Sequence, residues 1–219
     1  MCHLLFRDRL ATVLLCLPLM ATGGCGSNPS TEPARSPEPS QFEQASRLIM
    51  THVRLDQPSQ EGTYLKGGTA DLERGVAMLE SIIEQDPEHW QAHWLKGKAQ
   101  LTLREFAAAQ QSLAAAYRIA TLEEQVAIDY LLACLNCGDT ETAEQIVALQ
   151  LKRRPKDYRA HSNAALTHLL AGRLDEAASA AAEARSLEPN DPIARNVDKI
   201  IAEVRNGKRP QPTSLPELR

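Results

Sequence analysis

The chain repeats a pattern of small and helix-breaking residues every 34 positions. Gly138 and Gly172 form one such pair. Two longer series keep the same step, with small residues at Gly75, Ala109, Ala143 and Ala177 and turn residues at Pro87, Thr121, Pro155 and Pro189. A 34-residue period is typical of stacked helix-turn-helix units, each of which buries its apolar face only against its neighbours. The period therefore predicts an all-α stack, and it favours a binding surface over a catalytic pocket.

The composition agrees with closely packed helices and argues against one class of partner. Aromatic residues make up 4% of the chain, and runs of β-branched residues are absent, which suits helices better than a sheet. The formal net charge is −4, whereas proteins that bind nucleic acid usually carry a basic face. We therefore expect no nucleic-acid partner.

Residues 1–24 have the features of a secretory signal peptide. Arg7 and Arg9 precede an apolar run over residues 10–20, and small residues lead up to Gly24. This order of basic, apolar and small segments is typical of an export signal. The apolar run is too short to span a bilayer, which takes about 20 apolar residues. The sequence therefore predicts an exported protein.

Cys25 follows this segment directly and is similar to the lipidated cysteine of bacterial lipoproteins, although Thr22 stands where that family prefers Leu. The resemblance implies acyl chains on Cys25 that anchor the protein to a membrane. Gly26 is not the Asp that retains such proteins in the inner membrane of enteric bacteria, which favours the outer membrane, facing the periplasm. An ordinary signal peptide that happens to contain Cys25 is the alternative, and it would give a secreted or soluble periplasmic protein.

Residues 25–40 carry this cysteine and a segment rich in Pro and Ser. The segment contains prolines at Pro29, Pro33, Pro37 and Pro39. It has too little apolar surface to fold, so we expect a semi-extended tether between the membrane and the folded region.

The start of the folded region carries signals for helix ends. Ser40 and Glu43 have the spacing of a capping box, in which each side chain accepts a hydrogen bond from the other residue's backbone N–H. After a polar interruption, Thr69 is predicted to cap the next helix, which ends at Asp86-Pro87. This first unit is therefore predicted to be a degenerate repeat with a loop between its two helices.

Three further units, residues 90–121, 124–155 and 158–189, resemble the tetratricopeptide repeat family. The third matches best, with the small and turn-forming residues of the family at Ala165, Gly172, Ala177, Ala184 and Pro189. Leu131 and Gln150 of the middle unit are larger than the family prefers, and Arg104 stands at the family's Gly position. The resemblance implies an all-α solenoid of about three and a half helix-turn-helix repeats.

The last segments complete the predicted domain of residues 41–206. Asp191 as a cap and Pro192 in the first turn begin a final helix, which is expected to cover the apolar end of the stack. Beyond it, the Pro-rich residues 207–219 are predicted to be a flexible tail.

The resemblance also implies a groove formed by the first helix of each unit. Carried over from the family, its residues are Gln91, Trp94, Lys98, Leu101, Gln125, Ile128, Asp129, Leu132, Arg159, Asn163 and Leu166. This mixed and rather apolar set suits a peptide or an amphipathic helix of a partner protein. It lacks the clamp with which some family members hold chaperone C-termini. The alternative is that flanking helices, or another copy of the chain, fill the groove.

Cys134 and Cys137 form a CxxC pair, the spacing of thiol-disulfide oxidoreductases. Such enzymes place the attacking thiol at a helix N-terminus, where the helix dipole lowers its pKa. Here the pair stands just before Gly138, at the expected end of a helix, which is the unfavourable end of the dipole. We therefore expect structural cysteines or a local disulfide, with an envelope oxidoreductase as the rival hypothesis.

The histidines do not form a pattern that predicts catalysis. His89 and His93 have a spacing that can bind a metal on one helix, but the Glu of the metalloprotease motif is missing. His161 and His168 stand at core-facing repeat positions. We expect each to be packed or hydrogen-bonded, and we expect no catalytic residue, metal or cofactor.

Together these patterns predict a non-enzymatic, membrane-tethered scaffold that binds a peptide or helix of a partner protein, in cell-envelope assembly. A self-associating structural protein is a further alternative. The sequence names neither the partner nor the pathway.

Overall fold

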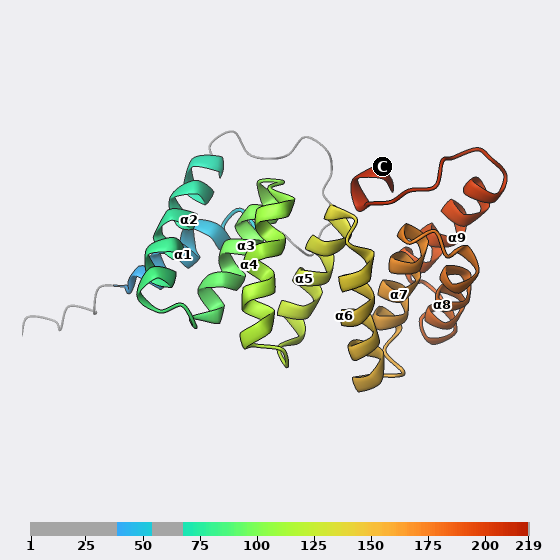
Figure 1. Cartoon of the computed structure of the whole chain (residues 1–219), viewed down its shortest axis with the longest axis horizontal. Helices are drawn as coiled ribbons and strands as arrows, with labels where there is room; N and C mark the ends of the chain where they lie inside the picture. The colour runs from blue at the N-terminus through green and yellow to red at the C-terminus, as the bar shows by residue number, and fades with distance from the viewer. Residues whose placement is uncertain (1–38, 54–67, 219) are drawn as a thin grey trace, which may run out of the picture. The chain divides into compact units, whose positions relative to one another are not determined.

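The computed structural model describes residues 39–53 and 68–218, and within these ranges all regular structure is helical (Figure 1). The predicted signal peptide, Cys25 and most of the predicted tether lie outside the described residues. The elements are α1 (Gln41–Met50), α2 (Gly68–Gln85), α3 (Trp90–Thr102), α4 (Phe106–Ile119), α5 (Glu124–Cys137), α6 (Thr140–Arg153), α7 (Tyr158–Leu170), α8 (Leu174–Leu187), α9 (Pro192–Arg205) and the 3₁₀ turn η1 (Leu215–Leu218).

Each α-helix packs against the next one along the chain, and alternate helices also meet, at α1–α3, α3–α5 and α7–α9. The three predicted units coincide with the pairs α3/α4, α5/α6 and α7/α8. The apolar core is accordingly divided into clusters that follow the chain, each shared between neighbouring pairs. This arrangement of paired helices confirms the predicted all-α repeat fold.

Small residues set how closely the two helices of a pair approach. Gly97 of α3 lies against Leu113 of α4, and a Cβ atom on Gly97 would lie 2.5 Å from the Cγ of Leu113. The corresponding residue of α7 is Ala165, which is fully buried. The middle pair has Leu131 at this position, and the backbones of α5 and α6 approach one another over fewer residues. The larger residue thus loosens the middle pair without changing the fold.

The turns inside the three pairs share one backbone geometry. Gly138 and Gly172 have φ of 75° and 76°, as predicted for residues that end a helix in the left-handed region. Arg104 takes the same conformation in the first pair, with φ of 63°. In each turn the next backbone N–H donates to the carbonyl five residues earlier at 2.9 Å. The repeat therefore imposes this turn even where the sequence supplies no glycine.

Most predicted helix ends agree with the structure. The capping box is present, because the backbone N–H of Ser40 donates to Glu43 Oε2 at 2.7 Å and that of Glu43 donates to Ser40 Oγ at 3.2 Å. Asp191 caps α9 by accepting from the backbone N–H of Ala194 at 2.8 Å. The prediction for Thr69 is wrong, because α2 already begins at Gly68, where the absence of a side chain allows contact with the His52 ring.

The apolar face of α9 covers the last repeat as predicted, since Val197, Ile200 and Ile201 are each less than 5% exposed. Burying three such side chains stabilises the fold by about 1.5–3 kcal/mol each. The segment that follows differs from the predicted flexible tail. Residues 207–218 fold back, Pro212 is buried, and η1 contacts α5. In the part of the chain that is described, no helix is both long and apolar enough to cross a bilayer.

Candidate functional site

Four of the residues predicted to line the groove form one polar cluster between α3 and α5. The indole N–H of Trp94 donates to Asp129 Oδ2 at 2.7 Å, and Gln125 Nε2 donates to Oδ1 of the same carboxylate at 3.1 Å. Lys98 Nζ lies 3.8 Å from Asp129 Oδ2 and 4.4 Å from the centroid of the Trp94 ring. These contacts join the first helices of two successive units. The hydrogen bond between Trp94 and Asp129 connects residues 35 positions apart in the chain.

The charges of this cluster are largely removed from water. Asp129 is 2% exposed and Lys98 6%. Burial lowers the pKa of Lys98, an effect that the charge of Asp129 opposes. Burial raises the pKa of Asp129, and Lys98, Trp94 and Gln125 oppose this shift. Since each charge compensates for the other, we infer that the pair fixes the position of α3 on α5.

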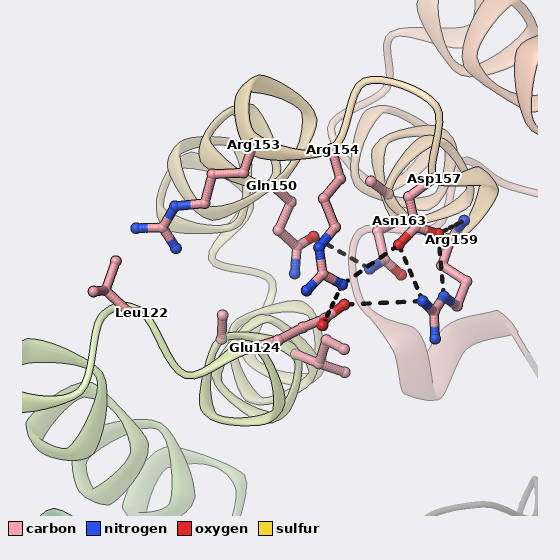
Figure 2. Close-up of a pocket in the computed structure, with 11 residues that line it drawn as sticks. Leu122, Glu124, Gln150, Arg153, Arg154, Asp157, Arg159 and Asn163 are labelled. Atoms are coloured by element: carbon pink, nitrogen blue, oxygen red, sulfur yellow. Dashed lines mark hydrogen bonds and ion pairs between the residues drawn. The ribbon is translucent and has the colours of Figure 1, made fainter.

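A pocket between α5, the end of α6 and α7 holds a second group of predicted residues, Ile128, Arg159 and Asn163 (Figure 2). Its cavity volume is about 60 Å³, far below the roughly 300–1,000 Å³ of sites that enclose a small molecule. Asn163 Nδ2 donates to Gln150 Oε1 at 3.4 Å across it. The pocket is therefore better suited to one side chain of a larger partner than to a separate ligand.

Ion pairs close one side of this pocket. The side chain of Arg159 donates two hydrogen bonds of 3.1 Å to Asp157, and its backbone N–H donates a third; these bonds lower the pKa of that carboxyl. Arg154 pairs with Glu124, which also lies 4.0 Å from Arg159 (Figure 2). Arg153 donates to the backbone carbonyl of Thr121 at 3.0 Å. Most of the charge on this side is thus neutralised within the protein.

The structure separates the predicted groove residues into two groups. Lys98, Leu101 and Asp129 are buried, so they are part of the packing between repeats and offer little surface to a partner. The other eight are half-buried or exposed, namely Gln91, Trp94, Gln125, Ile128, Leu132, Arg159, Asn163 and Leu166.

The environment of the CxxC pair opposes thiolate formation. Cys134 is buried, and Cys137 is exposed at the last position of α5. Burial raises the pKa of the Cys134 thiol to about 12, and the nearby Asp139 carboxylate adds to the shift. The pKa of Cys137 is raised by the same two causes. Both residues are free thiols, so the geometry fits structural cysteines better than a redox pair.

Four histidines make hydrogen bonds at the turns, three of them between units and His168 within the last unit. His89 caps α3, because its Nδ1 accepts the backbone N–H of Ala92 at 3.2 Å. His93 and His161, which are two repeats apart, each place Nε2 against a turn carbonyl, at 3.0 Å from Pro87 and 2.8 Å from Pro155. His168 Nδ1 lies 3.1 Å from an Arg173 nitrogen. The expectation of hydrogen-bonded histidines is confirmed. Across the described ranges, no three His, Cys, Asp or Glu side chains gather as a metal site would require.

Apart from Arg159, sequence reasoning missed the charged residues around the pocket, namely Glu124, Arg153, Arg154 and Asp157. A signal for them exists, because acidic residues and arginines that stand 30 positions apart form ion pairs in the structure. Glu88 and Arg118 pair at 2.8 Å, and the same interval joins Glu124 to Arg154 and Asp175 to Arg205. Thirty residues are four fewer than one repeat, and residues at this interval lie at neighbouring turns of the stack. The ion pairs could therefore have been predicted from the sequence.

Comparison with known proteins agrees with this geometry. The profile of the tetratricopeptide repeat matches residues 66–123 and 138–192, more than half of the chain. The chain belongs to the tetratricopeptide repeat family. No curated protein matches it.

Solved tetratricopeptide repeat structures share the fold at low sequence identity. YrrB, described as a tetratricopeptide repeat protein with an unusual peptide-binding site, is 16% identical over 66% of this chain and 74% of that chain, with a TM-score of 0.53. MamA is 15% identical over 68% of this chain and 87% of that chain, with a TM-score of 0.56. A MamA RS-1 double mutant is 11% identical over 78% and 97%, with a TM-score of 0.55.

Proposed function

We propose that this protein is a non-enzymatic scaffold that docks a peptide or an amphipathic helix of a partner protein on α3, α5 and α7. The observation that carries the proposal is the linkage of these three helices. Trp94 of α3 donates to Asp129 of α5, and the adjacent Ile128 lines the pocket that α5 shares with α7. The three helices are thus held together and present one shared surface, as a docking surface requires. We call this surface of α3, α5 and α7 the strip.

The accessible residues of the strip have the character of such a surface. Trp94, Ile128, Leu132 and Leu166 are half-buried apolar side chains, and polar residues stand beside them. A partner segment with one apolar and one polar face would contact both kinds. The peptide-binding site described for YrrB adds support, since that protein has a similar fold.

Charged substitutions on the strip test this proposal. Leu132→Arg and Leu166→Arg place a charge on the proposed surface and leave Trp94 and its buried hydrogen bond intact. Leu187→Arg on α8, where Leu187 is 38% exposed, is the matched control. Crosslinked capture from cells should lose a defined partner with the first two variants and keep it with the third. Unchanged partners with a folded protein would contradict the proposal.

We further propose that the chain acts at the cell envelope, tethered through lipid on Cys25 to the outer membrane and facing the periplasm. The order of signal, cysteine and Pro-rich segment supports this. Cys25→Ser should release the protein from the membrane fraction and remove the acyl mass from the mature chain. A membrane-bound Cys25→Ser variant, or a wild-type chain without acyl mass, would contradict lipid tethering. A self-associating structural protein stays an alternative, which light scattering of the purified chain tests.

A further inference from the structure

The segment that follows α9 returns to the carboxyl ends of α5 and α7. Figure 1 shows it leaving α9 and running back until η1 lies next to α5. Gln211 Nε2 donates to the backbone carbonyl of Leu169, in the last turn of α7, at 2.6 Å. The carbonyl of Thr213 lies above Gly138, where an added Cβ would be 3.1 Å away. The segment is therefore bound to the ends of both helices.

Two leucines supply the apolar part of this contact. Leu215 and Leu218 pack against the core cluster that contains Leu131, Leu135 and Leu170. Leu218 also packs against the cluster that α7 shares with α8 and α9. Residues three apart lie on one side of a 3₁₀ turn, so η1 presents both leucines to the helix ends together.

The turn that carries the leucines is held by its own side chains. Glu217 accepts the backbone N–H of Thr213 at 2.9 Å and the hydroxyls of Thr213 and Ser214 at 3.0 Å each. These hydrogen bonds lower the pKa of Glu217. Arg209 reaches back, with its Nε 2.8 Å from Glu203 Oε2 of α9. A segment with so many local bonds has a defined shape of its own, which reduces the entropy lost on binding.

We propose that the carboxyl ends of α5 and α7 form a second binding site, specific for a short turn with leucines three residues apart, and that residues 211–218 are its internal ligand. The site binds the side chain of Gln211 through the Leu169 carbonyl and the two leucines through the cluster around Leu135. Since Leu135, Leu169 and Leu170 also end the first helices that form the proposed strip, a partner that extends to this end must displace the segment. This last consequence rests on the proposed function, whereas the binding site itself does not.

A labelled peptide tests the site directly. Leu215→Asp/Leu218→Asp in the full chain should release the internal ligand, and a fluorescent peptide of residues 208–218 should then bind in trans and saturate. In the wild-type chain the attached segment competes at a roughly millimolar effective concentration, so a peptide with a Kd of about 0.1 mM should bind about tenfold more weakly. Lys208→Asp is the matched control, because it changes the charge equally at an exposed residue, and it should behave as wild type.

The outcomes decide between the proposals. A folded double variant that does not bind the peptide would overturn the second site, as would equal binding of a peptide in which both leucines are aspartate. If the double variant does not fold, Leu215→Ala/Leu218→Ala takes its place. A dimer of the wild-type chain formed by exchanged segments, detected by light scattering and lost in the double variant, would support the same site. The strip proposal fails separately, when Leu132→Arg and Leu166→Arg keep the partner.

Discussion

The first complete repeat, α3/α4, and the last, α7/α8, reach one backbone arrangement with different side chains. In the first, Gly97 leaves space that the large Leu113 fills. In the last, the corresponding residues are Ala165 and Ala181, both fully buried. The comparison teaches that the two helices can approach closely with a glycine facing a leucine or with two alanines, so neither position requires one particular residue.

The same two repeats differ in how the inner helices are fixed. Lys98 of α3 is buried beside Asp129, whereas the residue two repeats later is Leu166, which packs against apolar clusters. One end of the strip is thus held by a buried charge pair and the other by apolar packing. Substitutions that make one repeat resemble another, or that remove the feature distinguishing them, test this difference.

The largest effect is expected from removing the buried carboxylate. Asp129→Ala leaves Lys98 buried without its partner and should lower the free energy of unfolding by about 3–5 kcal/mol. Lys98→Leu/Asp129→Asn supplies the residues found one repeat later, Leu132 and Asn163, and should cost much less. Urea unfolding measures both, with Glu183→Ala on the exposed face of α8 as the control. An Asp129→Ala variant as stable as that control would show that the pair does not fix α3 on α5.

The next largest effect on stability is expected from changing the side chains that pack between α3 and α4. Leu113→Ala should cost about 2–5 kcal/mol by leaving a cavity, and Gly97→Ala about 1–3 kcal/mol by overpacking. The double variant copies the Ala165/Ala181 pair, so its cost should be at least 0.5 kcal/mol smaller than the sum of the single costs, roughly the lower limit for residues in contact. Additive costs in urea unfolding would contradict the coupling between these two facing positions.

The middle and last repeats should depend on pH in opposite directions through Cys134 of α5 and His168 of α7, which stand at equivalent positions 34 residues apart. Cys134 has a raised pKa of about 12 against an ordinary 9.0, so its stabilising contribution is present below pH 9 and is lost as pH rises toward 12. The loss is about 2 kcal/mol at pH 10.5. Burial lowers the pKa of His168 below 6.5, so its contribution is lost as pH falls below that value.

Unfolding at a series of pH values measures both slopes. Cys134→Ala should reduce the alkaline slope and leave the acidic one, and His168→Leu should do the reverse. A Cys134 thiol that reacts at neutral pH as fast as the exposed Cys137 would contradict the raised pKa and would restore the oxidoreductase hypothesis.

The smallest effects are expected in the turns. Arg104→Gly should raise the free energy of unfolding by about 1 kcal/mol, because glycine takes positive φ without steric cost. Gly172→Ala should lower it by about the same amount, and Gly138→Ala by more, since Thr213 stands close to the added methyl group. An unchanged Arg104→Gly variant would mean that the arginine turn is not strained.

The sequence predicted the helix ends and turns that recur in the repeats, but it was less informative about the contacts between units. Helix ends that depend on local chemistry, such as the Ser40 capping box and the positive φ at Gly138, follow from a few adjacent residues. The cluster of Trp94 and Asp129 depends on which faces of α3 and α5 meet, and no local pattern contains that information. The sequence therefore did not predict that packing between repeats buries three of the predicted groove residues.

Composition was misleading for the segment after α9. Its prolines and low apolar content predict a flexible tail, but two leucines and a self-capped turn are enough to bind it to existing helix ends. The binding surface is made by α5 and α7, so the segment alone could not reveal it. Arg104 shows the same limit, because the neighbouring helices impose a conformation that its own residue type disfavours.

Site-specific photo-crosslinking tests most directly whether the strip on α3, α5 and α7 is the docking surface. A photoreactive residue in place of Ile128, at the pocket between α5 and α7, is compared with one in place of Leu187 on α8. The account predicts a discrete adduct from position 128 that disappears when Leu132→Arg and Leu166→Arg are introduced, and no such adduct from position 187. Equal adducts from both positions, or an adduct at 128 that survives the two substitutions, would contradict it.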